Sequence, residues 1–183
     1  YVAVFNVLED SDLKIYNSFN VADLIQRTYF TINDQTSIGV GDNKNKIKTA
    51  LTQAESYLSE IYELNLDLIK VNDKSEEIDL ALSEMKKALD NTAAALKIIR
   101  GACEEDVYRD RVSASDKSSL DTQRLNINTA LINITDSQKT ISSLKISIEA
   151  AKGELQTAMD QLALKTAKPR QEDIDLYQAQ IDQ

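Results

Sequence analysis

The sequence LDTQRLNINTALINITDSQKTISSLKISIEAAKGELQTAMDQL, residues 120–162, decides the fold class. A large aliphatic residue recurs in it every seven positions, at Leu120, Ile127, Ile134, Ile141, Ile148, Leu155 and Leu162, and we call these seven residues the seam. A strict period of seven on a helix of 3.6 residues per turn gives a stripe that stays buried only against a partner helix that winds with it. The seam therefore predicts a long heptad helix over residues 118–166, about 60 Å of which carries the seam itself.

Three shorter apolar stripes with three-four spacing precede the seam and predict three more helices, at about residues 4–32, 44–71 and 74–103. Short connections make successive helices antiparallel neighbours. We therefore expect an all-α fold, an elongated antiparallel four-helix bundle with a long last helix extending as a coiled coil. In this division residues 1–117 hold three helices with their loops, residues 118–166 hold the heptad helix, and residues 167–183 hold a break and the start of a further helix.

The first connection is predicted from loop composition. Residues 33–43 hold Gly39 and Gly41 among polar side chains, which indicates a loop that ends at the cap candidates Asp42 and Asn43. The pair of glycines lacks the third glycine and the preceding strand of a phosphate-binding motif. We therefore interpret it as part of the loop.

The later connections are predicted from helix-start signals. A tight turn leads into a capping box formed by Asp73 and Glu76, at the start of the third helix. Residues 101–117 carry charges and serines without an apolar stripe, so we expect a longer link that ends at a cap formed by Ser118 and Asp121.

The composition argues against an enzyme and against nucleic acid as a partner. The chain has no His and a single Cys, the two residue types most used as zinc ligands and as activated nucleophiles or their bases, and we expect neither a metal nor a cofactor. The formal charge of −9 repels phosphate backbones. Four Gly and one Pro are too few for the many turns of a sandwich or barrel.

Other candidate sites have simpler structural explanations. Cys103 continues the seven-residue register of the third helix and is expected in the core. A carboxylate cluster lacks the spacing of a calcium loop and is expected to be a solvated loop; its members are Glu104, Glu105, Asp106 and Asp110. The N-terminal aromatic residues either fill a bundle core, which we favour, or line a ligand pocket; they are Tyr1, Phe5, Tyr16, Phe19, Tyr29 and Phe30.

The two ends of the chain suggest a piece of a longer protein. The chain starts at Tyr1 without a signal peptide, and it stops inside a helical pattern. It contains no run of about 20 apolar residues that could span a bilayer. We therefore expect further segments on either side.

The C-terminal third resembles the helical region of membrane fusion proteins, the haemolysin D-like periplasmic adaptors of bacterial efflux pumps and secretion systems. The resemblance lies in Leu-Ala-Leu-Lys at 162–165, in Ala-Lys-Pro-Arg-Gln-Glu-Asp-Ile at 167–174, and in Ala179. Such proteins often end a heptad helix with Leu-x-Leu-Lys, break at Ala-Gly-Pro-Arg-Pro-Glu-Asp-Ile, and continue into an Ala/Gln-rich helix. Here Lys168 and Gln171 replace the Gly and the second Pro, and Pro169 marks the helix break.

This resemblance implies a non-enzymatic module of the cell envelope, in the periplasm or at the cell surface, that acts as a structural spacer and a docking surface. Its partners would be transporter or other envelope proteins, with self-association as a further option. The membrane anchor would lie outside this fragment. The tips of such adaptors often carry an Arg, a Leu and a Ser at successive seven-residue steps. In this sequence Arg124 and Leu131 fit that motif, but Gln138 stands where the Ser is expected.

Two further expectations follow. Ile174, Tyr177 and Ile181 repeat at three-four spacing, so we expect the last helix to pack beside the end of the seam. The alternative function is an extracytoplasmic four-helix sensor domain of a chemoreceptor or histidine kinase, which requires a ligand pocket with convergent polar groups.

Overall fold

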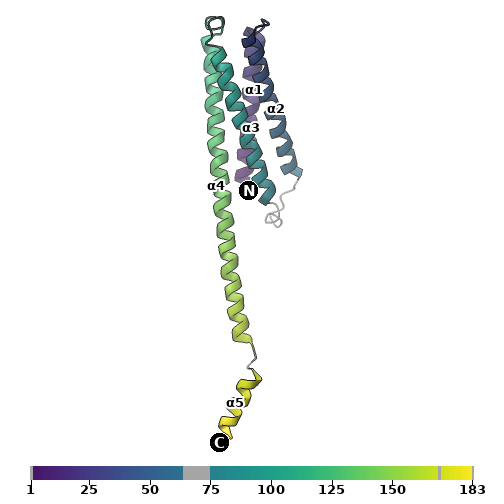
Figure 1. Ribbon diagram of the computed structural model, residues 1–183, viewed down its shortest axis with the longest axis vertical. Coiled ribbons are helices and arrows are strands. Elements are labelled where there is room, and N and C mark those ends of the chain that lie inside the picture. Colours follow the sequence, from purple (N-terminus) through teal and green to yellow (C-terminus); the bar gives the residue numbers. More distant parts are fainter. Residues whose placement is uncertain (1, 64–74, 169, 183) are drawn as a thin grey trace. The chain divides into compact units, whose positions relative to one another are not determined.

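The computed structural model describes residues 2–63, 75–168 and 170–182, and helices account for 88% of them, with no strand in these ranges (Figure 1). The helices are α1 (Val2–Tyr29), α2 (Gln35–Glu63), α3 (Ser75–Ala102), α4 (Ala114–Thr166) and α5 (Gln171–Ile181). The all-α prediction is therefore confirmed. The chain divides into two compact units, unit 1 (Tyr1–Thr140) and unit 2 (Ile141–Gln183), and α4 contributes to both.

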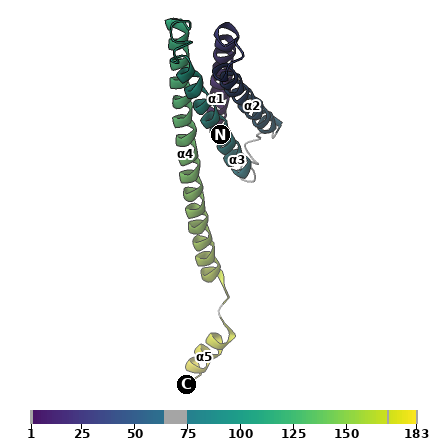
Figure 2. The same ribbon diagram turned by 45° about the horizontal axis from the view of Figure 1, so that its top comes forward.

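In unit 1, helices α1, α2 and α3 pack against one another, as both views show (Figures 1 and 2). Asp23 of α1 pairs with Lys44 near the start of α2, and Glu9 accepts a hydrogen bond from Tyr62 near its end. These contacts make α1 and α2 antiparallel.

The first part of α4 is joined to α1 and α3 by polar contacts near its start. The Tyr29 hydroxyl donates to Asp116 Oδ2 at 2.6 Å. The Arg100 guanidinium lies 3.1 Å from Asp121 Oδ2. This end of unit 1 is therefore fixed by hydrogen bonds as well as by packing.

The core of unit 1 consists of the apolar stripes of its helices. In α3, the residues in seven-residue register are fully buried, with Leu82, Leu89 and Leu96 followed by Cys103 at 0% exposure. Burial raises the pKa of the Cys103 thiol to about 11. A protonated thiol of this kind behaves as a small apolar core residue, as its register predicts.

The predicted loop over 33–43 is wrong, because α2 already begins at Gln35. Asp34 is the residue that starts it: its Oδ1 accepts a hydrogen bond from the Ser37 backbone N–H at 2.6 Å. An aspartate that accepts from the third residue of a helix satisfies one of the otherwise unpaired N–H groups of the first turn. The helix start therefore lies about nine residues earlier than the composition suggested.

Gly39 and Gly41 lie inside α2, and Asp42 and Asn43 are not caps. Asn43 donates from Nδ2 to the Gly39 carbonyl at 2.7 Å, within the helix. A glycine inside a helix costs about 1 kcal/mol relative to alanine. Burial of Val40, which is 1% exposed, offsets part of this cost, and tertiary packing thus overrides local composition.

The predicted cap of the fourth helix is also displaced. α4 begins at Ala114, and the Asp116 backbone N–H donates to Ser113 Oγ at 3.0 Å, so Ser113 is the cap rather than Ser118. Asp121 instead accepts from Arg100. The irregular link is correspondingly shorter than predicted and comprises residues 103–113.

Other boundaries agree within a few residues or are not described. α4 ends at Thr166 and α5 begins at Gln171, so the helix is interrupted where the break was predicted. Pro169 itself lies outside the described residues, as do the predicted turn at 72–73 and the end of the second helix at residue 71. The capping box is outside them in part, because Asp73 belongs to the same gap.

Candidate docking surface

The seam is buried from Leu120 to Ile141 and exposed from Ile148 onward. Exposure is 0% at each of Leu120, Ile127 and Ile134, and 4% at Ile141. It then rises to 38% at Ile148 and to 62% at Leu155 and Leu162. The same register of one helix is therefore covered in its first part and uncovered in its second.

Unit 2 exposes further large apolar side chains, beside the uncovered part of the seam and elsewhere on the helix. Other large apolar side chains of residues 141–166 are also exposed, namely Leu144, Ile146, Met159 and Leu164. Full burial of one Leu or Ile side chain is worth about 1.5–3 kcal/mol. We call the face formed by Leu144, Ile148, Leu155, Met159 and Leu162 the open seam, and a helix of matching shape would gain several such contributions by packing on it.

Small residues and balanced charges accompany the open seam. Ala151 and Ala158 stand three positions after Ile148 and Leu155, and small side chains there allow a partner helix to approach closely. Lys152 pairs with Glu149 at 2.8 Å on the same helix. Residues 141–166 contain three lysines and three carboxylates, so the helix presents no net charge to a partner.

α5 does not cover the open seam, contrary to the packing expected from its apolar spacing. Ile174 is 44% exposed, Tyr177 66% and Ile181 77%, while Leu155 and Leu162 remain exposed as well. The physical reason is the short length of α5. Three turns of helix with few apolar side chains would bury too little apolar surface to offset the conformational entropy lost on docking.

A buried polar cluster at the α3–α4 link was not predicted from the sequence. The Tyr108 hydroxyl donates to Asp34 Oδ2 at 2.6 Å and lies 2.7 Å from Ser37 Oγ. The Tyr108 ring is 1% exposed and stacks on Phe30 at 4.3 Å between centroids. The link is therefore anchored to the start of α2.

The Tyr108 cluster shifts the pKa of both ionisable partners. Burial, and then the hydrogen bond to Asp34, raises the pKa of Tyr108. The Tyr108 hydroxyl and the Ser37 N–H lower the pKa of Asp34. Both shifts favour a charged Asp34 and a neutral tyrosine, which is the arrangement of a structural anchor.

Two members of the carboxylate cluster of the link form ion pairs. Glu104 pairs with Arg100 and lies 3.5 Å from the Lys117 ammonium, and Asp106 lies 3.1 Å from Arg109. The Arg100 guanidinium lowers the pKa of Glu104. No group of three His, Cys, Asp or Glu side chains suited to a metal ion occurs within the described ranges.

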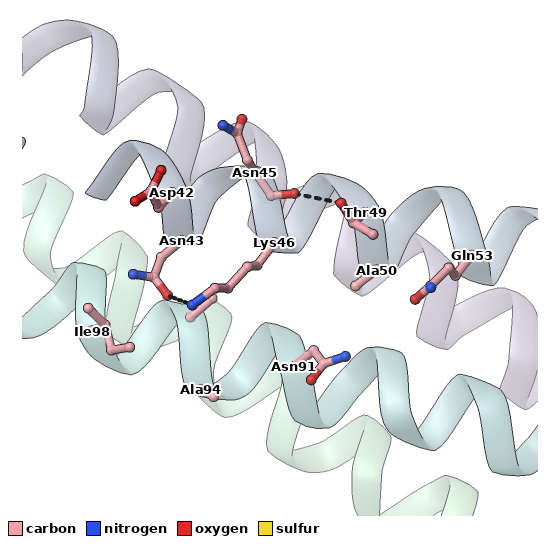
Figure 3. A pocket seen from close by; sticks show the side chains of 11 residues that line it. Asp42, Asn43, Asn45, Lys46, Thr49, Ala50, Gln53, Asn91, Ala94 and Ile98 are labelled. Atoms are coloured by element: carbon pink, nitrogen blue, oxygen red, sulfur yellow. Dashed lines mark hydrogen bonds between the residues drawn. The ribbon is translucent and has the colours of Figure 1, made fainter. Parts of the chain in front are cut away.

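A groove of about 520 Å³ lies between α2 and α3 (Figure 3). Its lining consists of Asp42, Asn43, Asn45, Lys46, Thr49, Ala50, Gln53, Asn91, Ala94, Ala95 and Ile98. The Lys46 ammonium donates to Asn43 Oδ1 at 3.4 Å, and Thr49 donates to the Asn45 carbonyl. The groove contains none of the N-terminal aromatic residues, so those that the structure describes do not line it.

One oxygen of a half-buried carboxylate in unit 1 has no hydrogen-bond partner among the described residues. Asp12 Oδ1 has no solvent contact and no partner in the described part of the chain. Burial, and then the charge of Glu55, raises the pKa of Asp12 to about 6. Asp12 is thus a destabilising feature of the interface between α1 and α2 at neutral pH.

None of the described helices is long and apolar enough to cross a membrane. Compared with protein-family models, with curated proteins and with solved structures, the chain gives no match.

Proposed function

We propose that the chain is the non-enzymatic helical domain of an extracytoplasmic adaptor, a membrane fusion protein, that serves an efflux or secretion transporter. In this proposal it is a structural spacer and a protein-docking module in the periplasm or at the cell surface. Residues 1–140 form an antiparallel four-helix bundle, and the last helix extends from it as a coiled coil. Segments outside residues 1–183 anchor the protein to the membrane.

The observation that carries this proposal is the open seam. Ile134 is fully buried, whereas Leu155, three heptads later in the same register, is 62% exposed. A soluble surface rarely keeps such a contiguous apolar stripe unless another molecule covers it. A helix that carries its apolar register beyond its own core is suited to docking.

Two features of the sequence support the adaptor in particular. Residues 162–174 resemble the end of the heptad helix and the break in membrane fusion proteins. The interruption between Thr166 and Gln171 lies at the corresponding place. The missing His and the buried Cys103 leave docking as a better supported role than catalysis.

A second candidate is an extracytoplasmic sensor domain, and the groove of Figure 3 is the observation that favours it. Three exposed carboxamide residues, Asn45, Gln53 and Asn91, are among those that line it. Such groups can bind a small polar ligand. The groove leaves the open seam unexplained, and we therefore rank the sensor second.

The test is transport by the full-length protein in cells that lack the native gene. Leu155→Asp places a charge in the open seam, and we expect transport to fall to the level of the deletion strain. Thr157→Asp is the matched control, because Thr157 is exposed and lies on the opposite face of α4. Immunoblots should show equal abundance of both variants.

Equal transport by the Leu155→Asp variant and the unaltered protein would contradict the adaptor proposal. The reading frame around the fragment gives an independent check. Lipoyl-like β segments on both sides would support an adaptor, whereas a helix that continues into a membrane span would support the sensor.

A further inference from the structure

We infer that the open seam is covered by the open seam of a second copy of this chain, packed antiparallel, with Leu155 opposite Ala158 of the second copy. This inference rests on the proposed docking role of the seam and names its partner. It is argued from the continuity of the seam, from the sizes of its side chains and from the charges beside it.

The continuity of the seam identifies the kind of occupant. In unit 1 the positions Ile127 and Ile134 are covered by packed helices. From Ile148 onward the same positions are uncovered in the same register. Because the seven-residue register does not change along α4, the inferred occupant is a helix that packs along α4 on the same face. α5, with 11 residues, is too short to be that helix.

Alternation of large and small residues makes this face complementary to itself when reversed. In an antiparallel pair, each seam residue of one helix lies opposite a residue of the other helix. That opposite residue stands three positions after one of the other helix's own seam residues. Leu155 then lies opposite Ala158 of the second copy, and Leu162 opposite Ala151. These two kinds of layer each combine one large and one small side chain, whereas Ile148 lies opposite Lys165 of the second copy, at the edge of the paired region.

A parallel pair is less well matched. It would place Leu155 opposite Leu155 and Ala158 opposite Ala158, so wide and narrow layers would alternate along the pair. A parallel pair would also align the seam residues before Ile141 of the two copies with each other. These residues are already buried within their own chain and are not free to pair. An antiparallel partner directs its own residues before 141 away from these covered positions.

The charges select one antiparallel register. A shift by one heptad would place Leu155 opposite Ala151 of the second copy, and it would set Lys152 near Lys152 and Glu154 near Glu154. Like charges at such flanking positions disfavour a pairing. In the inferred register Lys152 faces Met159 and Glu154 faces Gln161 instead.

Light scattering of the purified 183-residue chain is the first test. We expect a dimer, with twice the mass of 20.4 kDa, at micromolar concentration. Leu155→Asp should weaken the dimer by about 100-fold or more, because two charges would enter an apolar layer. Thr157→Asp, on the outer face, should leave the dimer intact. Far-UV circular dichroism checks that both variants keep their helices.

Disulfide trapping tests the direction and the register. The native Cys103 is buried, so a single added cysteine is the reactive thiol of each variant. We expect oxidation to link Leu155→Cys with Ala158→Cys when the two proteins are mixed, and neither variant efficiently with itself.

The other outcomes overturn the inference. A monomer at all accessible concentrations shows that a second copy is not the occupant. A disulfide of Leu155→Cys with itself shows a parallel pair, and one between Leu155→Cys and Ala151→Cys shows the other register. The proposed function has a separate readout: a monomeric chain whose Leu155→Asp variant still abolishes transport would retain the docking role and discard self-pairing.

Discussion

Ile134 and Leu155 occupy the same position of one heptad register on one helix, yet the first is fully buried and the second is 62% exposed. Ile134 belongs to unit 1, which also contains α1, α2 and α3, whereas beyond residue 141 the structure describes only the rest of α4 and the short α5. The comparison teaches that a heptad pattern specifies which face of a helix is apolar and leaves open which molecule covers that face.

The largest expected difference between the two parts of the seam is in folding stability. Ile134→Asp should destabilise unit 1 by about 3–5 kcal/mol, because it buries an unpaired carboxylate among aliphatic side chains. Ile141→Asp, at the buried first residue of unit 2, should also be destabilising. Leu155→Asp should change the unfolding free energy of unit 1 by less than about 0.5 kcal/mol. Chemical denaturation followed by circular dichroism, at a concentration that keeps the chain monomeric, measures all three.

Equal destabilisation by the Ile134 and Leu155 substitutions would break the comparison. It would mean that the second part of the seam is covered within the same chain in solution. The docking proposal would then lose its surface.

The second prediction concerns the polar anchor of unit 1. Tyr108→Phe keeps the ring that stacks on Phe30 but removes the hydroxyl that contacts Asp34 and Ser37. Loss of a buried hydrogen-bonding partner costs about 1–3 kcal/mol of unfolding free energy. Chemical denaturation should therefore show a lower unfolding midpoint for the Tyr108→Phe variant. Tyr177→Phe in α5 is the matched control, because this tyrosine is 66% exposed. A null effect of Tyr108→Phe would show that water replaces the hydroxyl without cost.

Periodic features of the fold could be predicted from the sequence. The registers of α3 and α4 are visible because burial acts on every turn of a long helix and leaves a repeated mark. The end of α4 at Thr166 follows from local stop signals of the same kind. Such signals depend on neighbours in the chain, and a sequence displays them directly.

Features that depend on distant residues could not be predicted. Tyr108 anchors the link by contacts with a residue 74 positions away, and no local spacing announces such a pair. Residues 33–43 have the composition of a loop, and only the burial of Val40 in a tertiary core makes helix the better state. The occupant that we infer for the open seam belongs to neither class, because it is a second molecule.

The third prediction is a pH dependence that arises in unit 1. Burial raises the pKa of Asp12 to about 6 in the folded protein, whereas the pKa of Asp12 in the unfolded chain is near 3.8. The folded protein therefore binds the proton of the Asp12 carboxyl group more tightly than the unfolded chain does. The associated stability is present below about pH 4 and is lost as the pH rises through 6. Asp12→Asn should therefore stabilise unit 1 at pH 7, by about 1 kcal/mol after allowance for solvent screening, and have little effect at pH 4.

Thermal unfolding of the Asp12→Asn variant between pH 4 and 8 measures this difference. Asp110→Asn, an exposed substitution in the link, is the control and should leave the curve unchanged. Loss of stability below pH 4 should persist in both variants, because the pKa values of Asp34 and Asp116 are lowered by hydrogen bonds. A pH-independent gain from Asp12→Asn would assign the effect to packing rather than to ionisation.

The smallest expected effects come from two glycines, one in each part of the molecule. A Cβ at Gly39 or Gly153 meets no atom within 4 Å, and both residues lie inside helices. Alanine favours a helix by about 0.5–1 kcal/mol over glycine. Gly39→Ala should therefore raise the unfolding midpoint of unit 1 by about 2–4 °C. Gly153→Ala should raise the helical signal and the amide protection of residues 141–166 and leave that midpoint unchanged. If Gly39→Ala instead lowered the midpoint, the segment around it would be a loop that needs glycine, and the start of α2 would move back toward residue 44.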